Sequence, residues 1–482
     1  MSLIDVLILI AFAVTGFLLN LIPFTRKFRL NYLLIASIGI IFWLQPGLPI
    51  RGLDFWLPTA TILIAALGWW LTSRAQDRDL RATLLTSLQI AAEVLIIALT
   101  RYFSSSGVIT PSRPPQLYLV VILLAVSGVI FYWLSRTRET RSTFLAAAIF
   151  ALIMLFVGLK LPALTQWVSS ALRGLTGQSR ELASALDIRW LGYSYIAFRL
   201  IHTLRDRQTG HLPAMRLDEY LVYMLFFPSF NAGPIDRAER FISQLRTAET
   251  PSPRQLEAGL SRLVVGLFKK FVLADTLALI ALNGTNAYQI EGLGWYWLLL
   301  YAYSFQIFFD FSGYTDLAIG MGLLLGIRLP ENFNHPYLKP NLTRFWDSWH
   351  MSLTQWFRAY FFNPVTRFLR TKARSLPAWV VILITQLATM TLIGLWHGIT
   401  LNFVFWGIWH GLGLFINNRW SNATRQLAAR IKARPWLDHG LTVFSTLLTF
   451  HYVALGWVWF ALPDPTTSLR VFTGLLGGVG AP

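Results

Sequence analysis

The chain has 482 residues, of which 55% are hydrophobic and only 13% are charged, against about 25% charged residues in an average soluble domain. This composition excludes an ordinary soluble enzyme and predicts a multi-pass protein of the cell membrane. The formal charge of +18 is spread over short segments and forms no basic stripe on a soluble module, so the expected partner is the lipid bilayer and not nucleic acid.

The N-terminal third, residues 1–165, contains six hydrophobic runs separated by short polar breaks and no chemical motif. The first run, 3–24, has no basic segment before it and no Ala-x-Ala-like site after it, so we expect a retained helix and not a cleaved signal. The whole chain holds roughly eleven to thirteen runs near the 20 apolar residues that a spanning helix needs. We therefore expect an all-α polytopic membrane protein, with motif-free transmembrane helices in 1–165 and a functional core in 166–482.

Basic residues are expected to gather in short loops between the hydrophobic runs, and such clusters mark the cytoplasmic side of a membrane protein. Three of these clusters lie in the second half of the chain: Lys269 and Lys270; Arg367, Arg370, Lys372 and Arg374; and Arg425, Arg430, Lys432 and Arg434.

The core contains several segments that are too short or too polar for ordinary spans. Residues 220–230 are interrupted by Pro228. Residues 260–329 read as two or three helices, and we expect a break at Gly313. Residues 330–374 carry too many charges to face lipid, so they must line a cavity, lie at an interface or pack inside the protein.

Two Trp-His dipeptides, Trp349-His350 and Trp396-His397, stand out in this apolar setting. The second falls at the junction of two expected spans, 378–396 and 403–416, and therefore at a helix end or interruption. An imidazole can accept a hydroxyl proton near neutral pH, because its ordinary pKa is about 6.5. From the residues alone, a membrane histidine can equally be a group that hydrogen-bonds between helices.

The neighbours of the two histidines give further expectations. Gly394 and Gly398 would let backbone or a substrate chain approach His397 closely. Asp347, three residues before His350, would share its helical face; the alternative for His350 is an Asp-His pair at the membrane surface. His410 is expected to pack, and the remaining histidines show no zinc-like spacing, so we predict no metal. The chain has no cysteine, which excludes a cysteine-linked acyl-enzyme.

Four segments in this order carry a resemblance to a known family: Phe226–Arg237, Phe309–Asp316, Pro330–Tyr337 followed by Phe345–Leu353, and Gly394–Thr400. Together they resemble the membrane-bound O-acyltransferase family, and within it the bacterial branch that acylates cell-surface polymers. The resemblance implies a helical bundle with re-entrant and short helices around a central chamber. It also implies that His397 is the general base and that His350 lines the chamber, where it positions or polarises a reactant. The further residues that it implies for substrate binding are Asp310, Asn332, Asn334, Trp349, Arg358 and Trp396; without the family, such polar groups could simply join broken helices.

By this resemblance, an acyl thioester (acyl-CoA or an acyl carrier protein) is the co-substrate, and no cofactor is bound. The acyl group would pass from this cytoplasmic donor to hydroxyls of a surface polysaccharide or teichoic-acid-like polymer, directly or through an accessory acyltransferase outside the cytoplasm. The D-alanyl transfer subgroup is resembled by residues 225–230, 233–237, 397–400 and 410–413. The alginate acetylation subgroup is resembled by residues 313–320 and 330–334, so acetyl and D-alanyl both stay open. Two other classes remain: a transporter or flippase, against which the absence of internal repeats counts, and a non-catalytic scaffold of a polymer-modification complex.

Overall fold

The computed structural model describes residues 1–103, 108–136, 142–247 and 250–478. These residues form helices joined by loops, and their extended pairing is limited to the isolated bridge between Phe333 and Trp349. Seven of the described helices are long and apolar enough to cross a membrane. The expected all-α polytopic fold is confirmed, although fewer of the described helices meet this criterion than the eleven to thirteen apolar runs expected from the sequence.

The chain divides into two compact units, one of Met1–Leu263 with Leu317–Leu329 and the other of Val264–Asp316 with Pro330–Pro482. Helices α12 (Pro253–Leu267) and α15 (Leu293–Leu324) each pass from one unit into the other. These units are defined by packing, so the functional division expected near residue 165 stays a prediction.

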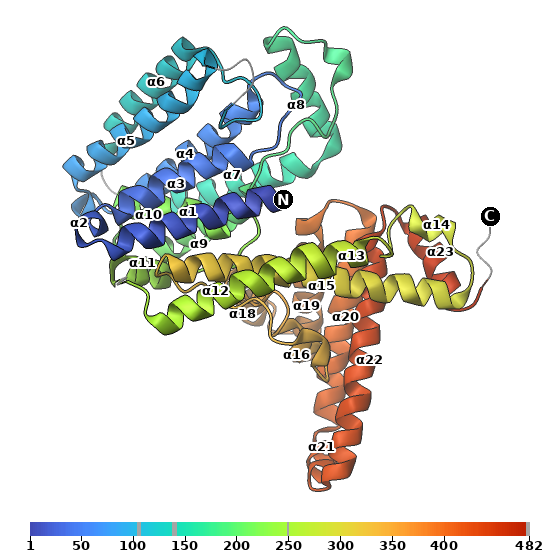
Figure 1. Cartoon of the computed structure of the whole chain (residues 1–482). Helices are drawn as coiled ribbons and strands as arrows, with labels where there is room; N and C mark the ends of the chain where they lie inside the picture. Colours follow the sequence, from blue (N-terminus) through green and yellow to red (C-terminus); the bar gives the residue numbers. More distant parts are fainter. Residues whose placement is uncertain (104–107, 137–141, 248–249, 479–482) are drawn as a thin grey trace. The chain divides into compact units, whose positions relative to one another are not determined.

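The six hydrophobic runs predicted in the N-terminal third are six helices of the first unit (Figure 1). Five of them meet the length and hydropathy needed for a span, and the 16-residue α3 is a shorter apolar helix. The helices are α1 (Leu3–Leu21), α3 (Arg29–Leu44), α4 (Leu53–Thr72), α5 (Leu80–Leu99), α6 (Leu117–Ser135) and α7 (Ser142–Lys160).

The first unit also encloses the short helix that Pro228 ends. Helix α10 (Leu217–Leu225) packs on α3 and α4, and a single turn follows at Phe227–Ser229. A broken helix leaves carbonyl groups without helical partners, which is costly in an apolar interior. Arg199 of α9 (Tyr193–Thr209), only 2% exposed, donates to the carbonyls of Tyr223, Met224 and Ser229 at 3.2, 2.6 and 3.0 Å. A buried arginine therefore stabilises the break.

The second unit is built on α19 (Ala378–His397), which packs along α20 (Leu401–Ala423), which in turn packs along α22 (Pro435–Ala461). The short α21 (Arg425–Lys432) joins α20 to α22 at the tip of a long hairpin, drawn in orange and red in Figure 1. The shorter helices of this unit are α13 (Asp275–Ala278), α14 (Asn286–Gln289), α16 (Leu342–Trp346), α17 (Met351–Phe357), α18 (Asn363–Lys372) and α23 (Pro465–Leu475).

Two expectations about the middle of the chain are wrong. Gly313 does not break a helix: α15 runs through it without interruption. Lys269 and Lys270 do not lie in a loop, because they belong to a π-helical segment, Phe268–Ala274, that continues from α12 into α13. Both positions are used for close contacts between helices, which local composition alone does not reveal.

Candidate active site

His350 stands between α16 and α17 with its backbone in the left-handed region, at φ 44°. This conformation is uncommon for a residue with a Cβ and must be held by its surroundings. The expectation that Asp347 shares a helical face with His350 is wrong, because α16 ends at Trp346 and Asp347 instead forms an ion pair with Arg358. A surface Asp-His pair is also excluded, since His350 is only 4% exposed.

Asn332 holds the chain around His350 in place. Its backbone carbonyl accepts a hydrogen bond from the Met351 N–H at 3.0 Å. Its side-chain oxygen Oδ1 accepts from the backbone N–H and the hydroxyl of Ser352 at 3.1 and 2.6 Å. The neighbouring Phe333 pairs with Trp349 in the isolated bridge. Asn332 therefore fixes the first turn of α17 and, with it, the position of His350.

The His350 ring lies among aromatic side chains, with the Phe311 ring centroid 4.6 Å away in an edge-on contact and that of Trp396 at 6.4 Å. Burial, together with a smaller effect of the nearby His397, lowers the pKa of the His350 imidazole to about 3. His350 is therefore neutral at physiological pH. A neutral imidazole can donate one hydrogen bond and accept another.

His397 is the last residue of α19, as the sequence predicted for a helix end, and it is half-buried. Its ring centroid lies 4.5 Å from that of Trp396 and 4.7 Å from that of Phe460. A Cβ on Gly394 would lie 2.2 Å from the Phe403 carbonyl oxygen, so the glycine allows α20 to begin directly against α19. The close approach expected beside His397 is thus made by the backbone of α20.

Both predicted histidines therefore lie near the Trp396 ring. Several buried polar atoms near them have no hydrogen-bond partner among the described residues: both ring nitrogens of His350, Asn332 Nδ2, and Nε1 of Trp406, whose ring contacts His397. Buried polar atoms in proteins are usually paired. Their accumulation around two imidazoles is what a site built to contact a polar reactant requires, with one group to accept a proton and others to hold oxygen atoms.

Residues 190–455, more than half of the chain, match the membrane-bound O-acyltransferase family, MBOAT. The chain belongs to this family. The resemblance carried by the four sequence segments is therefore confirmed, and both predicted histidines lie within the matched region of this MBOAT protein.

Several proteins with known names are similar to more than half of the chain. The chain is 35% identical over 275 residues to a probable alginate O-acetylase of Pseudomonas syringae pv. tomato, covering 56% of this chain and 48% of that protein. It is 33% identical over 288 residues to a teichoic acid D-alanyltransferase of Streptococcus thermophilus, covering 57% and 68%. A peptidoglycan O-acetyltransferase of Helicobacter pylori is 33% identical over 262 residues, covering 54% and 46%. The chain spans about half the length of the two O-acetylating relatives and about two thirds of the D-alanyl transferase.

The other residues predicted for substrate binding in this MBOAT protein fall into different surroundings. Trp349, 5% exposed, packs among the rings of Phe333, Phe345 and Trp457 and contributes to an aromatic core. Asn334 is exposed, and its side-chain oxygen forms a hydrogen bond with the ring of its neighbour His335. Their binding roles stay predictions.

Two of the predicted binding residues are charged groups in ion pairs. Arg358 is half-exposed and pairs with Asp347 at the start of a second π-helical segment, Arg358–Phe362. Asp310 of α15 pairs with Lys270. The predicted Trp396 has the most direct position, because its ring contacts both histidines.

His410 packs as the sequence predicted. It is fully buried on α20, with the ring centroids of Trp346 and Trp406 at 5.0 and 4.9 Å. Within the described part of the chain, no group of three or more His, Asp or Glu side chains is arranged to hold a metal ion.

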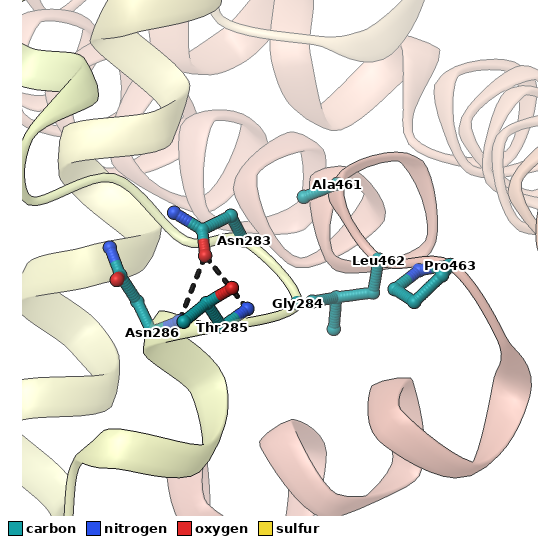
Figure 2. Close-up of a pocket in the computed structure, with 7 residues that line it drawn as sticks. All are labelled: Asn283, Gly284, Thr285, Asn286, Ala461, Leu462 and Pro463. Carbon is teal, nitrogen blue, oxygen red and sulfur yellow. Dashed lines mark hydrogen bonds between the residues drawn. The ribbon is translucent and has the colours of Figure 1, made fainter.

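An open pocket with a volume of about 560 Å³ lies at the end of α22 (Figure 2). It is lined by Asn283–Asn286 and Ala461–Pro463 and by none of the predicted site residues. The Asn283 side-chain oxygen accepts from the backbone N–H groups of Thr285 and Asn286 at 2.9 and 2.8 Å, which shapes the loop (Figure 2). Phe460, whose ring contacts His397, immediately precedes this wall of the pocket.

Sequence reasoning missed Phe311 and Phe460, the two phenylalanines against the histidines, and the lysines that pair with Asp310 and Asp316. The phenylalanines carry no signal of their own in a chain with 35 of them. The lysines do: two adjacent ammonium groups inside a hydrophobic helical run are costly and therefore demand partners.

Proposed function

We propose that this protein is a membrane-bound O-acyltransferase that transfers an acetyl or D-alanyl group from a cytoplasmic acyl thioester to a hydroxyl of a cell-surface polymer. The single observation that carries the proposal is that His350 and His397 both lie near the Trp396 ring, close to buried polar atoms without partners. The names of the relatives, O-acetylases and a D-alanyltransferase, supply the two acyl groups.

In the proposed reaction, His397 accepts the proton of the acceptor hydroxyl while the hydroxyl oxygen attacks the carbonyl carbon of the thioester. The carbonyl oxygen becomes an oxyanion, which needs hydrogen-bond donors, and the neutral His350 is suited to donate one. The intermediate then collapses, the carbon–sulfur bond breaks and the thiolate takes the proton from the His397 imidazolium. An ester and a free thiol result, and no acyl-enzyme is needed. The thioester is already activated, so the protein's tasks are positioning and proton transfer.

The charge pattern supports the direction of the proposed transfer. Basic residues stand before α19, in α18, and at the tip between α20 and α22, in α21. By the positive-inside rule these ends face the cytoplasm. His397 is the last residue of α19, at the end opposite to the basic residues. This position agrees with an acceptor that arrives from the outer side. An accessory acyltransferase on that side would be compatible with the same geometry.

The test is the ester-linked acyl content of the isolated surface polymer, released by mild base and identified by mass, in cells with the unmodified protein, His397→Ala or no protein. We expect the loss of acetate or D-alanine in both mutant strains at equal membrane levels of the two proteins. His439→Ala, at an exposed histidine of α22, is the matched control and should retain full acylation.

Full acylation with His397→Ala would overturn the catalytic assignment and favour a scaffold. If polymer export, and not only its acylation, stopped in both mutant strains, a transporter or flippase would be favoured instead. The identity of the released acid would also decide between the acetyl and D-alanyl groups.

A further inference from the structure

Two adjacent lysines reach from the π-helical segment Phe268–Ala274 to α15. The Lys269 Nζ lies 2.7 Å from Asp316 Oδ2, and the Lys270 Nζ lies 2.5 Å from Asp310 Oδ1. π-helical segments are rare, occur mostly as short insertions inside α-helices and are frequent at functional sites. Four charged groups in a hydrophobic helical run are costly unless paired, so these contacts are a built feature of the second unit.

Helical geometry places the two aspartates on either side of Gly313. With about 100° per residue, Asp310 and Asp316 each lie about 60° around the helix axis from Gly313, in opposite directions. A Cβ on Gly313 would lie 2.9 Å from the Lys270 backbone nitrogen and 3.0 Å from the Gly266 carbonyl oxygen. The π-helical backbone thus rests on Gly313, and one lysine reaches around each side of α15.

The opposite face of α15 packs against the segment of His350. Phe311 lies about 160° around the axis from Gly313. Its ring makes edge-on contacts with His350 at 4.6 Å and with Phe333 at 5.1 Å between centroids. Phe308, which shares this face, contacts Phe333 and Trp349. Any rotation of α15 about its axis therefore moves Phe311 relative to the His350 imidazole.

We propose that the Lys269–Asp316 and Lys270–Asp310 ion pairs form a clasp that fixes the rotation of α15 and thereby positions His350 for acyl transfer. The lysines and aspartates are positioning residues, which act through Phe311. The effect on catalysis rests on the proposed function, whereas the positioning of His350 by the ion pairs does not. Asp316 is 5% exposed and Asp310 is 49% exposed, so the Lys270–Asp310 pair can be changed with the smaller risk of leaving a buried carboxylate unpaired.

The first experiment measures the accessibility of individual histidines by diethyl pyrocarbonate modification and mass spectrometry of the purified full chain. The variant is Lys270→Met, which removes the charge and keeps most of the chain length. We expect a severalfold faster modification of His350, which is otherwise protected by burial. His410 and His202, 0% and 1% exposed, should stay protected, and the exposed His439 should react equally in both proteins.

A charge exchange, Lys270→Asp with Asp310→Lys, tests whether the pair itself is responsible. We expect the double variant to restore the protection of His350, and each single change to abolish it. Unchanged protection of His350 in Lys270→Met would overturn the proposal. Faster modification of His350 and His410 together would also overturn it, because the pair would then stabilise the whole unit and not the rotation of one helix.

The second experiment measures acyl transfer, as the ester content of the surface polymer in cells that carry the same variants. We expect it to fall with Lys270→Met at equal membrane levels and to recover with the charge exchange. A fall without any change in the protection of His350 would show that the pair acts on the substrate and not through His350. The labelling experiment needs no acyl transfer, so a failure of the proposed function would leave its result interpretable.

Discussion

His350 and His397 follow tryptophan in the same dipeptide, yet the fold gives them opposite surroundings. His350 is buried, held in a left-handed backbone conformation and neutral. His397 ends a helix and is half-buried, so a reactant can reach it. The difference explains why we assign proton transfer to His397 and hydrogen bonding to His350. The dipeptide alone could not distinguish them.

The lowered pKa of His350 predicts how stability depends on pH. Below pH 6.5 the unfolded chain binds a proton at this imidazole, whereas the folded chain, with a pKa of about 3, does not. The folded state therefore loses up to about 1.4 kcal/mol for each pH unit between these values. In His350→Gln the loss of stability caused by this imidazole is absent. Tm should therefore decline less steeply from pH 6.5 to pH 4 than in the unmodified protein.

The measurement is thermal unfolding of the purified full chain in detergent at several pH values. His439→Gln, a substitution of the same kind at an exposed site, should follow the unmodified protein. A decline that is equally steep in His350→Gln would show that the imidazole is already protonated in the folded state and would contradict its role as a neutral donor.

The sequence points to both histidines as candidate site residues, because an imidazole in an apolar run is costly unless it has a partner or a function. It could not identify their neighbours. Asp310 pairs with Lys270, 40 residues away in the sequence, and the register of a π-helical segment decides which lysine it meets. Its role in substrate binding stays a prediction. Asp347 was predicted beside His350, but the chain ends one helix and begins another between them.

At the scale of helices, length and hydropathy predicted the six N-terminal helices well, because each is a continuous apolar run of about the length that a bilayer requires. The conformational freedom of glycine wrongly predicts a break at Gly313. Its missing side chain instead lets α15 contact the π-helical backbone. A glycine in a helix can serve either purpose, and only the partner helix decides which.

The contact between α19 and α20 predicts a strong effect of a small substitution. In Gly394→Ala the new Cβ would lie 2.2 Å from the Phe403 carbonyl oxygen, so one helix must shift. Overpacking of this kind typically costs about 1–3 kcal/mol. Because His397 lies one turn further along α19, we expect both a lower Tm and a loss of polymer acylation.

Gly440→Ala in α22 is the matched control, because a Cβ there meets nothing within 4 Å. Alanine is the better helix former by up to about 1 kcal/mol, so Tm should stay equal or rise slightly and acylation should be unchanged. Equal behaviour of the two variants in thermal unfolding and in polymer ester content would contradict the close packing that positions His397.

For the whole molecule, the distribution of charge predicts the orientation in the membrane. Helix α19 has 20 residues and reaches about 30 Å, enough to cross a bilayer. Its N-terminal end follows the basic α18, and the basic α21 lies at the shared tip of α20 and α22. The opposite end of α19 carries His397, and the opposite end of α22 adjoins the pocket of Asn283–Asn286 with Ala461–Pro463. The positive-inside rule therefore predicts that His397 and this pocket face outward.

The natural absence of cysteine makes this orientation directly measurable. Thr285→Cys places an exposed thiol in the pocket, and Asn422→Cys places one near the basic tip. In intact cells, with any outer membrane permeabilised, a membrane-impermeant maleimide should label the first variant, label the second only after lysis, and leave the unmodified protein unlabelled. The reverse pattern would put the basic residues outside and His397 on the donor side, and the proposed path of the acyl group would have to run in the opposite direction.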